Sequence, residues 1–292
     1  DSKDRPFNSQ YNNRRISMAA ILRMSGITMR YVNDRTLDEL TPGKYDLVIV
    51  PPTPVLCDAA AERFKKYAKS GGKLIVCGPT GAYDEWRKPR ATLGGWDDLG
   101  VALPEAWRDY HAFKGSAISG NMISDWKELP PMKDAEKIAD DGVKATHRQW
   151  GKGEIFWFAD CPSRYGFNQW ERPLKNWMRG FIAATGINRD AWWQDDLPLE
   201  KAWISKAVGT GTPYVEVVLR RNPAGRILVC VLNLGGAGSG TVVLPGFNGA
   251  TLTDVIGGGN VTLTGDGLHL ELPAIGYRIF ITDEKFVLRD DK

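Results

Sequence analysis

The chain has 292 residues, 42% of them hydrophobic and 25% charged, which is typical of a globular protein with room for two domains. The net charge is +3, and the densest basic cluster, Arg87–Arg90, is too short for a nucleic-acid surface. Since no apolar run approaches the ~20 residues that cross a bilayer, we expect neither nucleic acid nor a membrane as a partner.

Up to about residue 195, helix-like and strand-like patterns alternate. The sequence predicts a helix over 16–25, ended by Gly26, and a short strand over Met29–Val32. The apolar run 45–50 stops at two prolines and predicts a strand buried on both faces. A helix over 58–70 follows, with Asp58 as its N-cap and two glycines after its end.

Further strands are predicted at 73–77 and 154–159, and a further helix at 171–185. Strands that alternate with helices indicate a mostly parallel sheet that is covered on both faces. We therefore expect an α/β domain over residues 1–195.

After residue 196 glycine and turn signals become frequent, and no segment reads as a helix. In Leu268–Leu272, apolar and polar residues alternate as on a half-buried antiparallel strand. We expect a small antiparallel β-sandwich over 196–292, joined to the first domain by a linker at 195–200. Its predicted strands are 215–219, 227–232, 241–244, 268–272 and 277–281.

Catalytic motifs are mostly absent. Cys77 ends a predicted strand, but Ile75 and Pro79 stand where the tight elbow of a nucleophilic cysteine needs glycine. The three histidines show no metal-ligand spacing to one another, to cysteine or to carboxylates, and no phosphate-binding glycine loop is present. We expect no catalytic residue, no cofactor and no metal site in this chain.

The four cysteines lie far apart, and nothing in their spacing requires an oxidising compartment. The chain begins with Asp1 rather than Met, so we expect a trimmed N-terminus. Removal of a signal peptide stays open, and so does the choice between the cytoplasm and a secreted or periplasmic location.

Tryptophan is abundant, with 11 residues, and several lie in a stretch without regular pattern after residue 83. Indole rings in such loops fill a core, form a subunit interface or stack on sugar, and the sequence leaves these three roles open. Loops after the carboxyl ends of parallel strands are common functional sites. We expect the region from Tyr83 to Trp107 to face a partner protein or a sugar. Its candidate contact residues are Asp84, Glu85, Trp86, Arg87, Trp96 and Trp107.

Several segments, in the right order, resemble the middle and C-terminal domains of glycoside hydrolase family 42 β-galactosidases. In the middle domain the likeness is carried by 45–51, 59–67, 71–76, 81–85, 150–158 and 185–187. In the C-terminal domain it is carried by 232–234, 252–255 and 272–277.

The resemblance implies a flavodoxin-like, glutamine-amidotransferase-like domain that has lost its chemistry and serves trimer assembly, followed by the small β-domain. Members of the family hold both catalytic glutamates in a preceding (β/α)8 barrel, which takes ~250 residues. The implied partners are therefore a catalytic barrel, as a domain or a separate chain, and further copies of the chain in a homo-oligomer. The sugar contact stays open.

One departure concerns residues 1–15, which are polar where the family has a first strand. A free edge in a buried sheet is unfavourable, so we expect another segment to fill it and the chain to be a piece of a larger protein. Two alternatives remain: an independent carbohydrate-binding or scaffolding protein, and a degenerate amidotransferase-like enzyme that uses Cys77. The intact mass of the natural protein tests the first alternative, and thiol labelling tests the second.

Overall fold

The computed structural model describes residues 18–101 apart from 20, 21, 24, 28, 79, 91, 93 and 95; 132–158 apart from 141 and 142; 181–196 apart from 183, 184 and 188–190; and 211–286 apart from 284 and 285. These residues form two compact units. The first covers 31–158, and the second combines 19–30 with 181–286. Within the described residues, no helix is long and apolar enough to cross a membrane.

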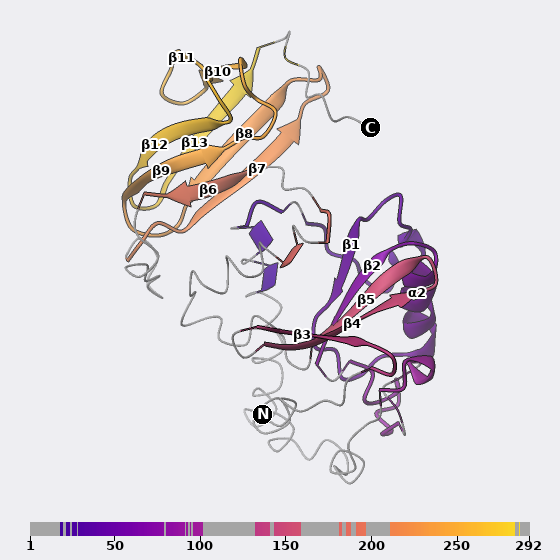
Figure 1. Cartoon of the computed structure of the whole chain (residues 1–292). Coiled ribbons are helices and arrows are strands. Elements are labelled where there is room, and N and C mark those ends of the chain that lie inside the picture. The colour runs from indigo at the N-terminus through magenta and orange to yellow at the C-terminus, as the bar shows by residue number, and fades with distance from the viewer. Residues whose placement is uncertain are drawn as a thin grey trace. The chain divides into compact units, whose positions relative to one another are not determined.

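A five-stranded sheet with the order β1-β2-β5-β4-β3 forms the centre of the first unit (Figure 1). The strands β1 (Leu47–Val50), β2 (Lys73–Cys77) and β5 (Gly153–Phe158) run parallel and confirm the three strands predicted from apolar runs. The predicted burial on both faces is wrong for β1, in which only Val48 and Val50 are buried, because this strand pairs on one side alone among the described strands. The sequence did not predict β4 (Val143–Trp150), which pairs antiparallel with β5, or β3 (Glu136–Asp140), which pairs antiparallel with β4.

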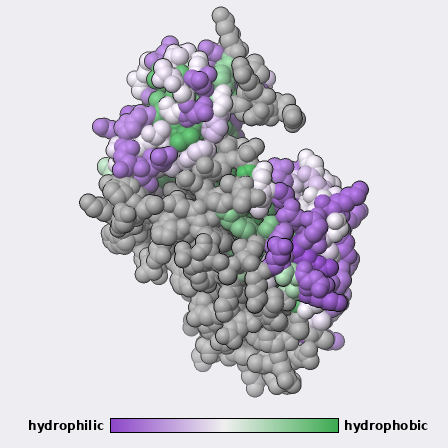
Figure 2. Space-filling model, viewed as in Figure 1, coloured by the Kyte–Doolittle hydropathy of each residue, from purple (hydrophilic) through white to green (hydrophobic). Residues whose placement is uncertain are grey.

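The helix α2 (Asp58–Lys69) follows β1 and confirms the prediction for this segment. Its buried residues come at helical spacing, and the surface over the helix is mostly hydrophilic (Figure 2). The N-cap is Cys57 and not Asp58, as the sequence predicted. The carboxylate of Asp58 instead binds the Arg90 guanidinium at 2.5 Å. At the other end, the N–H of Gly72 closes the helix by donating to the carbonyl of Tyr67 at 3.1 Å.

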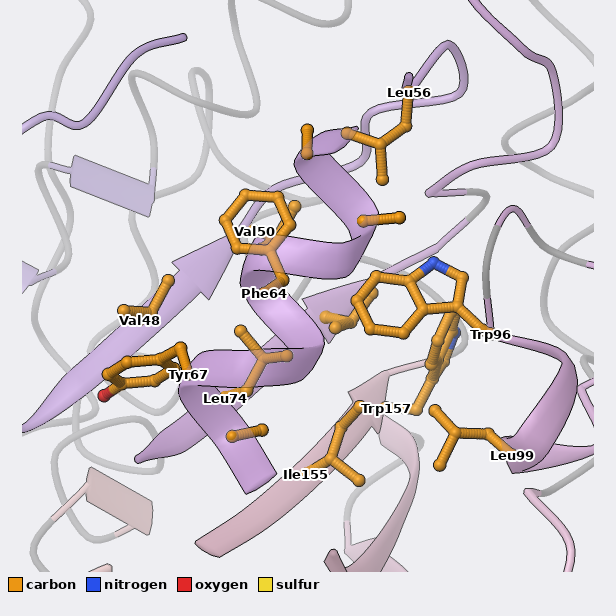
Figure 3. Close-up of a cluster of buried hydrophobic side chains, with 14 of the residues drawn as sticks. Val48, Val50, Leu56, Phe64, Tyr67, Leu74, Trp96, Leu99, Ile155 and Trp157 are labelled. Atoms are coloured by element: carbon orange, nitrogen blue, oxygen red, sulfur yellow. The ribbon is translucent and has the colours of Figure 1, made fainter. Parts of the chain in front are cut away.

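The core of this unit lies between α2 and the sheet (Figure 3). Phe64 and Tyr67 from the helix contact the strands, and the Tyr67 hydroxyl donates a hydrogen bond to the Tyr45 carbonyl at 2.9 Å. Burial raises the pKa of this phenol, because its ionised form would lose hydration. Each large apolar side chain that is fully buried contributes about 1.5–3 kcal/mol. Further members of the core are Val48, Val50, Leu74, Trp96, Leu99, Ile155 and Trp157.

Two short 3-10 helices, η1 (Leu37–Glu39) and η2 (Asp97–Leu99), complete the regular structure of the first unit as described. The predicted strand Met29–Val32 is wrong, because these residues belong to no sheet. Among the described strands β1 is the edge of the sheet and pairs only with β2. A strand at 29–32 would need a neighbour to satisfy its backbone groups, and the described residues provide none.

The second unit consists of two antiparallel sheets with a common core, which confirms the predicted β-sandwich (Figure 1). One sheet has the order β11-β10-β13-β8-β7, and the other the order β12-β9-β6. The strands β6, β10 and β11 were not predicted. The bounds are β6 (Trp192–Asp195), β7 (Val215–Arg221), β8 (Ile227–Asn233), β9 (Gly238–Val243), β10 (Thr251–Asp254), β11 (Asn260–Thr262), β12 (Gly267–Leu272) and β13 (Gly276–Thr282).

The strand β6 pairs with β9, so the sandwich includes four residues that precede the expected division at 195/196. A turn near the start of the chain also belongs to this unit. Residues 19, 22 and 23 are helical, and the chain turns at Gly26, as predicted. Gly26 has a φ of 74°, and a Cβ there would lie 1.8 Å from the Ala191 carbonyl oxygen, so only glycine fits this turn. The described part of the predicted helix 171–185 is helical at residues 181 and 182.

Candidate functional site

The loop after β2 is bound to the segment after β1 by backbone hydrogen bonds. The N–H of Gly81 donates to the Thr53 carbonyl and that of Tyr83 to the Pro54 carbonyl, both at 2.9 Å. In return, the N–H of Leu56 donates to the Tyr83 carbonyl at 3.1 Å. Both segments follow parallel strands, so they meet at the same edge of the sheet. The base of the candidate loop is therefore a fixed platform, with the Tyr83 side chain buried.

Asp84 organises the tip of this loop. Its carboxylate oxygen Oδ1 accepts hydrogen bonds from the N–H groups of Trp86 at 2.9 Å and Lys88 at 2.7 Å. Its own N–H donates to the Lys88 carbonyl at 3.0 Å, which closes the turn. Arg87 adopts a φ of 62°, which is uncommon for a residue other than glycine. The turn presents Trp86 to the surface, where 76% of the residue is exposed.

Arg90 connects this tip to neighbouring segments of the first unit. Its guanidinium donates to the Leu56 carbonyl at 2.8 Å, in addition to its bond with Asp58, and lies 4.0 Å from the Glu85 carboxylate. Exposed ion pairs of this kind contribute about 0–1 kcal/mol each. Their effect here is positional, because one partly buried arginine links the loop to the start of α2 and to the segment after β1.

The two described tryptophans of the candidate set have opposite environments. Trp96 is fully buried, with its ring centroid 5.6 Å from that of Trp157 in an edge-to-face arrangement and 6.1 Å from that of Trp150 (Figure 3). In this structure it is a core residue and offers no surface to a partner. Trp107, the third candidate tryptophan, lies outside the described residues.

The described side chain of Asp84 and those of the two described histidines are engaged in local contacts. The carboxylate of Asp84 is engaged with the backbone, which does not suit it to proton transfer. No group of three or more histidines, cysteines and carboxylates in the described part of the chain could hold a metal ion. His147 pairs with Glu154 at 3.2 Å, and His269 pairs with Asp196 at 2.9 Å.

The exposed pair on the second unit is an ordinary surface contact. The carboxylate of Asp196 also accepts a hydrogen bond from the side chain of Ser239, and the bonds from Ser239 and His269 lower the pKa of Asp196. The side chains of His269 and Asp196 are 60% and 44% exposed, as is usual for a surface pair.

The end of β2 does not form a nucleophile elbow around Cys77. A nucleophile in such an elbow sits on a strained turn that exposes its side chain. Here the residue with the left-handed φ, 54°, is Gly78, which has no side chain, and Cys77 before it is fully buried. This geometry disfavours an amidotransferase-like reaction at Cys77.

We predict that Cys77 of the native chain reacts with iodoacetamide far more slowly than Cys57, which is partly exposed. The reason is that a buried thiol is not accessible to the reagent. Peptide mass spectrometry over a time course measures both rates, and the chain unfolded in urea gives the unprotected rate. Labelling of native Cys77 at the unfolded rate would restore the amidotransferase alternative.

No protein-family model and no curated protein matches the chain. Solved structures of β-galactosidases match it along most of its length. That from Bacillus circulans sp. alkalophilus has a TM-score of 0.60 at 17% identity, covering 94% of this chain and 38% of the other. That from Rahnella sp. R3 has a TM-score of 0.57 at 19% identity, covering 94% and 37%. A catalytic mutant of Gan42B, a GH42 β-galactosidase from G. stearothermophilus, has a TM-score of 0.57 at 14% identity, covering 94% and 36%.

The chain thus spans little more than a third of the length of these proteins. Its described strands form open sheets and a sandwich and not a closed barrel, so the match is to a non-barrel part of GH42 β-galactosidases. At this level of identity the likeness establishes the fold. The resemblance drawn from the sequence is therefore confirmed as a likeness of fold to a non-barrel part of these enzymes.

Proposed function

We propose that the chain is the non-catalytic assembly region of a family-42-like glycoside hydrolase of the β-galactosidase type and that it acts together with a catalytic barrel. The observation that carries the proposal is the extent of the structural match. Both units match in one alignment that covers 94% of this chain but only 36–38% of the β-galactosidases. A region that matches these enzymes outside their barrel fits an accessory role.

The loop tip at residues 84–87 is the proposed contact with a neighbouring subunit or with the barrel. Trp86 is a large side chain held out from a fixed platform, so little conformational entropy is lost when a partner covers it. Tryptophan and arginine are the residue types that most often anchor interfaces. Asp84 contributes by holding the turn, while Glu85 and Arg87 lie at its rim.

We predict that Trp86→Ala weakens assembly of the complete enzyme by about 2 kcal/mol, or roughly 30-fold in the dissociation constant. Sedimentation velocity over a concentration series measures the shift. Tyr31→Ala is the matched control, because Tyr31 is also an exposed aromatic residue of the first unit. Trp86→Phe should restore most of the affinity, since it keeps an aromatic anchor.

Assembly that is unchanged by Trp86→Ala would remove this loop from the interface. An unchanged assembly with weaker binding of galactosides would assign Trp86 to sugar contact, the other role that its sequence context left open. Equal weakening by Tyr31→Ala would show that the effect is not specific to the loop tip.

A further inference from the structure

The loop after β2 is a short hairpin whose two arms are bonded to each other. Tyr83 and Pro89 form an antiparallel bridge, and the N–H of Arg90 donates to the Ala82 carbonyl at 3.0 Å. We name residues 82–90 the tip hairpin. Its first arm is bonded to the segment after β1 through the backbone of Tyr83. Its second arm has an attachment of its own, at Arg90.

Arg90 attaches the second arm through its side chain. One terminal nitrogen of the guanidinium donates to the Asp58 carboxylate at 2.5 Å, and the other donates to the Leu56 carbonyl at 2.8 Å. These acceptors lie at the start of α2 and just before it, 32 and 34 residues away along the chain. Because the two bonds use both prongs of a rigid planar group, they fix the direction of the guanidinium as well as its distance.

The environment of this side chain does not suit a purely stabilising role. The Arg90 side chain is only 17% exposed, and its Nε atom is buried without a hydrogen-bond partner. A buried donor that lacks an acceptor lowers stability, since it has lost its water. Gly94 lies against the same atom, and a Cβ there would be 2.9 Å from Nε. An arginine is thus accommodated where folding uses only part of its hydrogen-bonding capacity.

The same guanidinium also reaches the tip of the loop. The Glu85 carboxylate lies 4.0 Å from it, and Glu85 directly precedes the exposed Trp86. Each of these contacts alone is weak, because exposed ion pairs are screened by water. Together they connect the residue beside Trp86 with the start of α2, which restricts how the tip moves against the rest of the first unit.

We infer that Arg90 is the positioning residue of the proposed contact at the loop tip. Its guanidinium holds the tip hairpin in one orientation, so that Trp86 is already placed before a partner covers it. An anchor that is ordered in advance loses less conformational entropy on binding, which raises affinity. This inference rests on the proposed function and adds the residue on which the contact at Trp86 depends.

A double-mutant cycle in the complete enzyme tests this dependence. Arg90→Gln is expected to weaken assembly about fivefold in sedimentation velocity, because the tip then has to be ordered when the partner binds. In the Trp86→Ala background the same change should alter assembly by less than about twofold, since the anchor that Arg90 positions is gone. An arginine that only stabilises the fold would weaken both backgrounds equally.

Three further variants make the result specific. Arg63→Gln is the matched control, because Arg63 also binds a carboxylate at 2.5 Å, that of Asp38, but lies outside the tip hairpin; it should leave assembly unchanged. Asp58→Asn removes one partner of Arg90 at a side chain that is 70% exposed, so it tests the same link if Arg90→Gln fails to fold. It should weaken assembly about twofold. Arg90→Lys keeps the charge but loses the planar fork, and it should resemble Arg90→Gln.

Hydrogen exchange of the 292-residue chain reports the orientation of the tip hairpin without any partner. The N–H groups of Leu56 and Tyr83, which bond the hairpin to the segment after β1, should exchange about fivefold faster in Arg90→Gln, while those of β2 stay unchanged. Equal exchange in both proteins would show that the hairpin is held without Arg90 and would overturn the inference.

The assembly measurements separate this inference from the proposed function. Unchanged assembly in Arg90→Gln and Asp58→Asn, with a loss in Trp86→Ala, would overturn the positioning role and leave the proposed contact intact. Equal weakening in both backgrounds would assign Arg90 to stability alone and would also overturn the role. Assembly that Trp86→Ala leaves unchanged would overturn the proposed contact itself, together with the part of Arg90 in it.

Discussion

Trp96→Ala is expected to lower the free energy of unfolding of the first unit by about 3–5 kcal/mol, the range for removing a buried tryptophan. This corresponds to a fall in the melting temperature of that unit of roughly 10 °C. Trp96 is fully buried between Trp150 and Trp157, and its neighbours come from β4 and β5. Alanine would leave a cavity between the loop and the sheet that rigid neighbours cannot fill.

The loss is expected to come from packing. The indole nitrogen of Trp96 is buried without a hydrogen-bond partner, so its removal breaks no hydrogen bond. Scanning calorimetry resolves the effect, because the second unit has its own core and its transition should stay in place.

Trp86→Ala is the matched control, since it removes the same side chain from the same loop at an exposed position. Its stability change should stay within about 0.5 kcal/mol. Equal melting temperatures for the two variants would contradict the burial of Trp96 and the environments assigned to both residues.

Much of the sheet in the first unit could be predicted because its parallel strands are continuous apolar runs. Lys73–Cys77 lies inside the sheet with Leu74 to Cys77 buried, whereas Leu47–Val50 is at the edge of the described sheet and buries only alternate residues. The apolar runs therefore predicted both strands, but burial on both faces holds for the inner strand alone. The strand Glu136–Asp140 was missed because it is short and mostly polar, and its place depends on pairing with β4. The strand Met29–Val32 was predicted from its apolar residues, but pairing decides whether a strand forms.

The sequence located the candidate site on a loop, but it did not show which of the candidate residues are buried and which are exposed. Trp86 and Trp96 are ten positions apart in a segment without periodicity, so no pattern separates the core residue from the exposed one. The separation comes from tertiary contacts: Asp84 turns the chain so that Trp86 points outward, and β5 supplies the partner for Trp96. Asp58 was wrongly predicted to be the N-cap of α2 for a related reason. Its carboxylate binds Arg90, which lies 32 residues away along the chain, and a local sequence pattern does not show such a contact.

Hydrolysis of nitrophenyl β-galactoside by the purified chain tests the proposed non-catalytic role most directly. Retaining glycosidases need two carboxyl groups about 5 Å apart on either side of the bond, and in the proposed function these belong to the catalytic barrel. We expect no turnover above the uncatalysed rate. Turnover that persists through repeated purification and is abolished by Asp84→Asn or Glu85→Gln would contradict it.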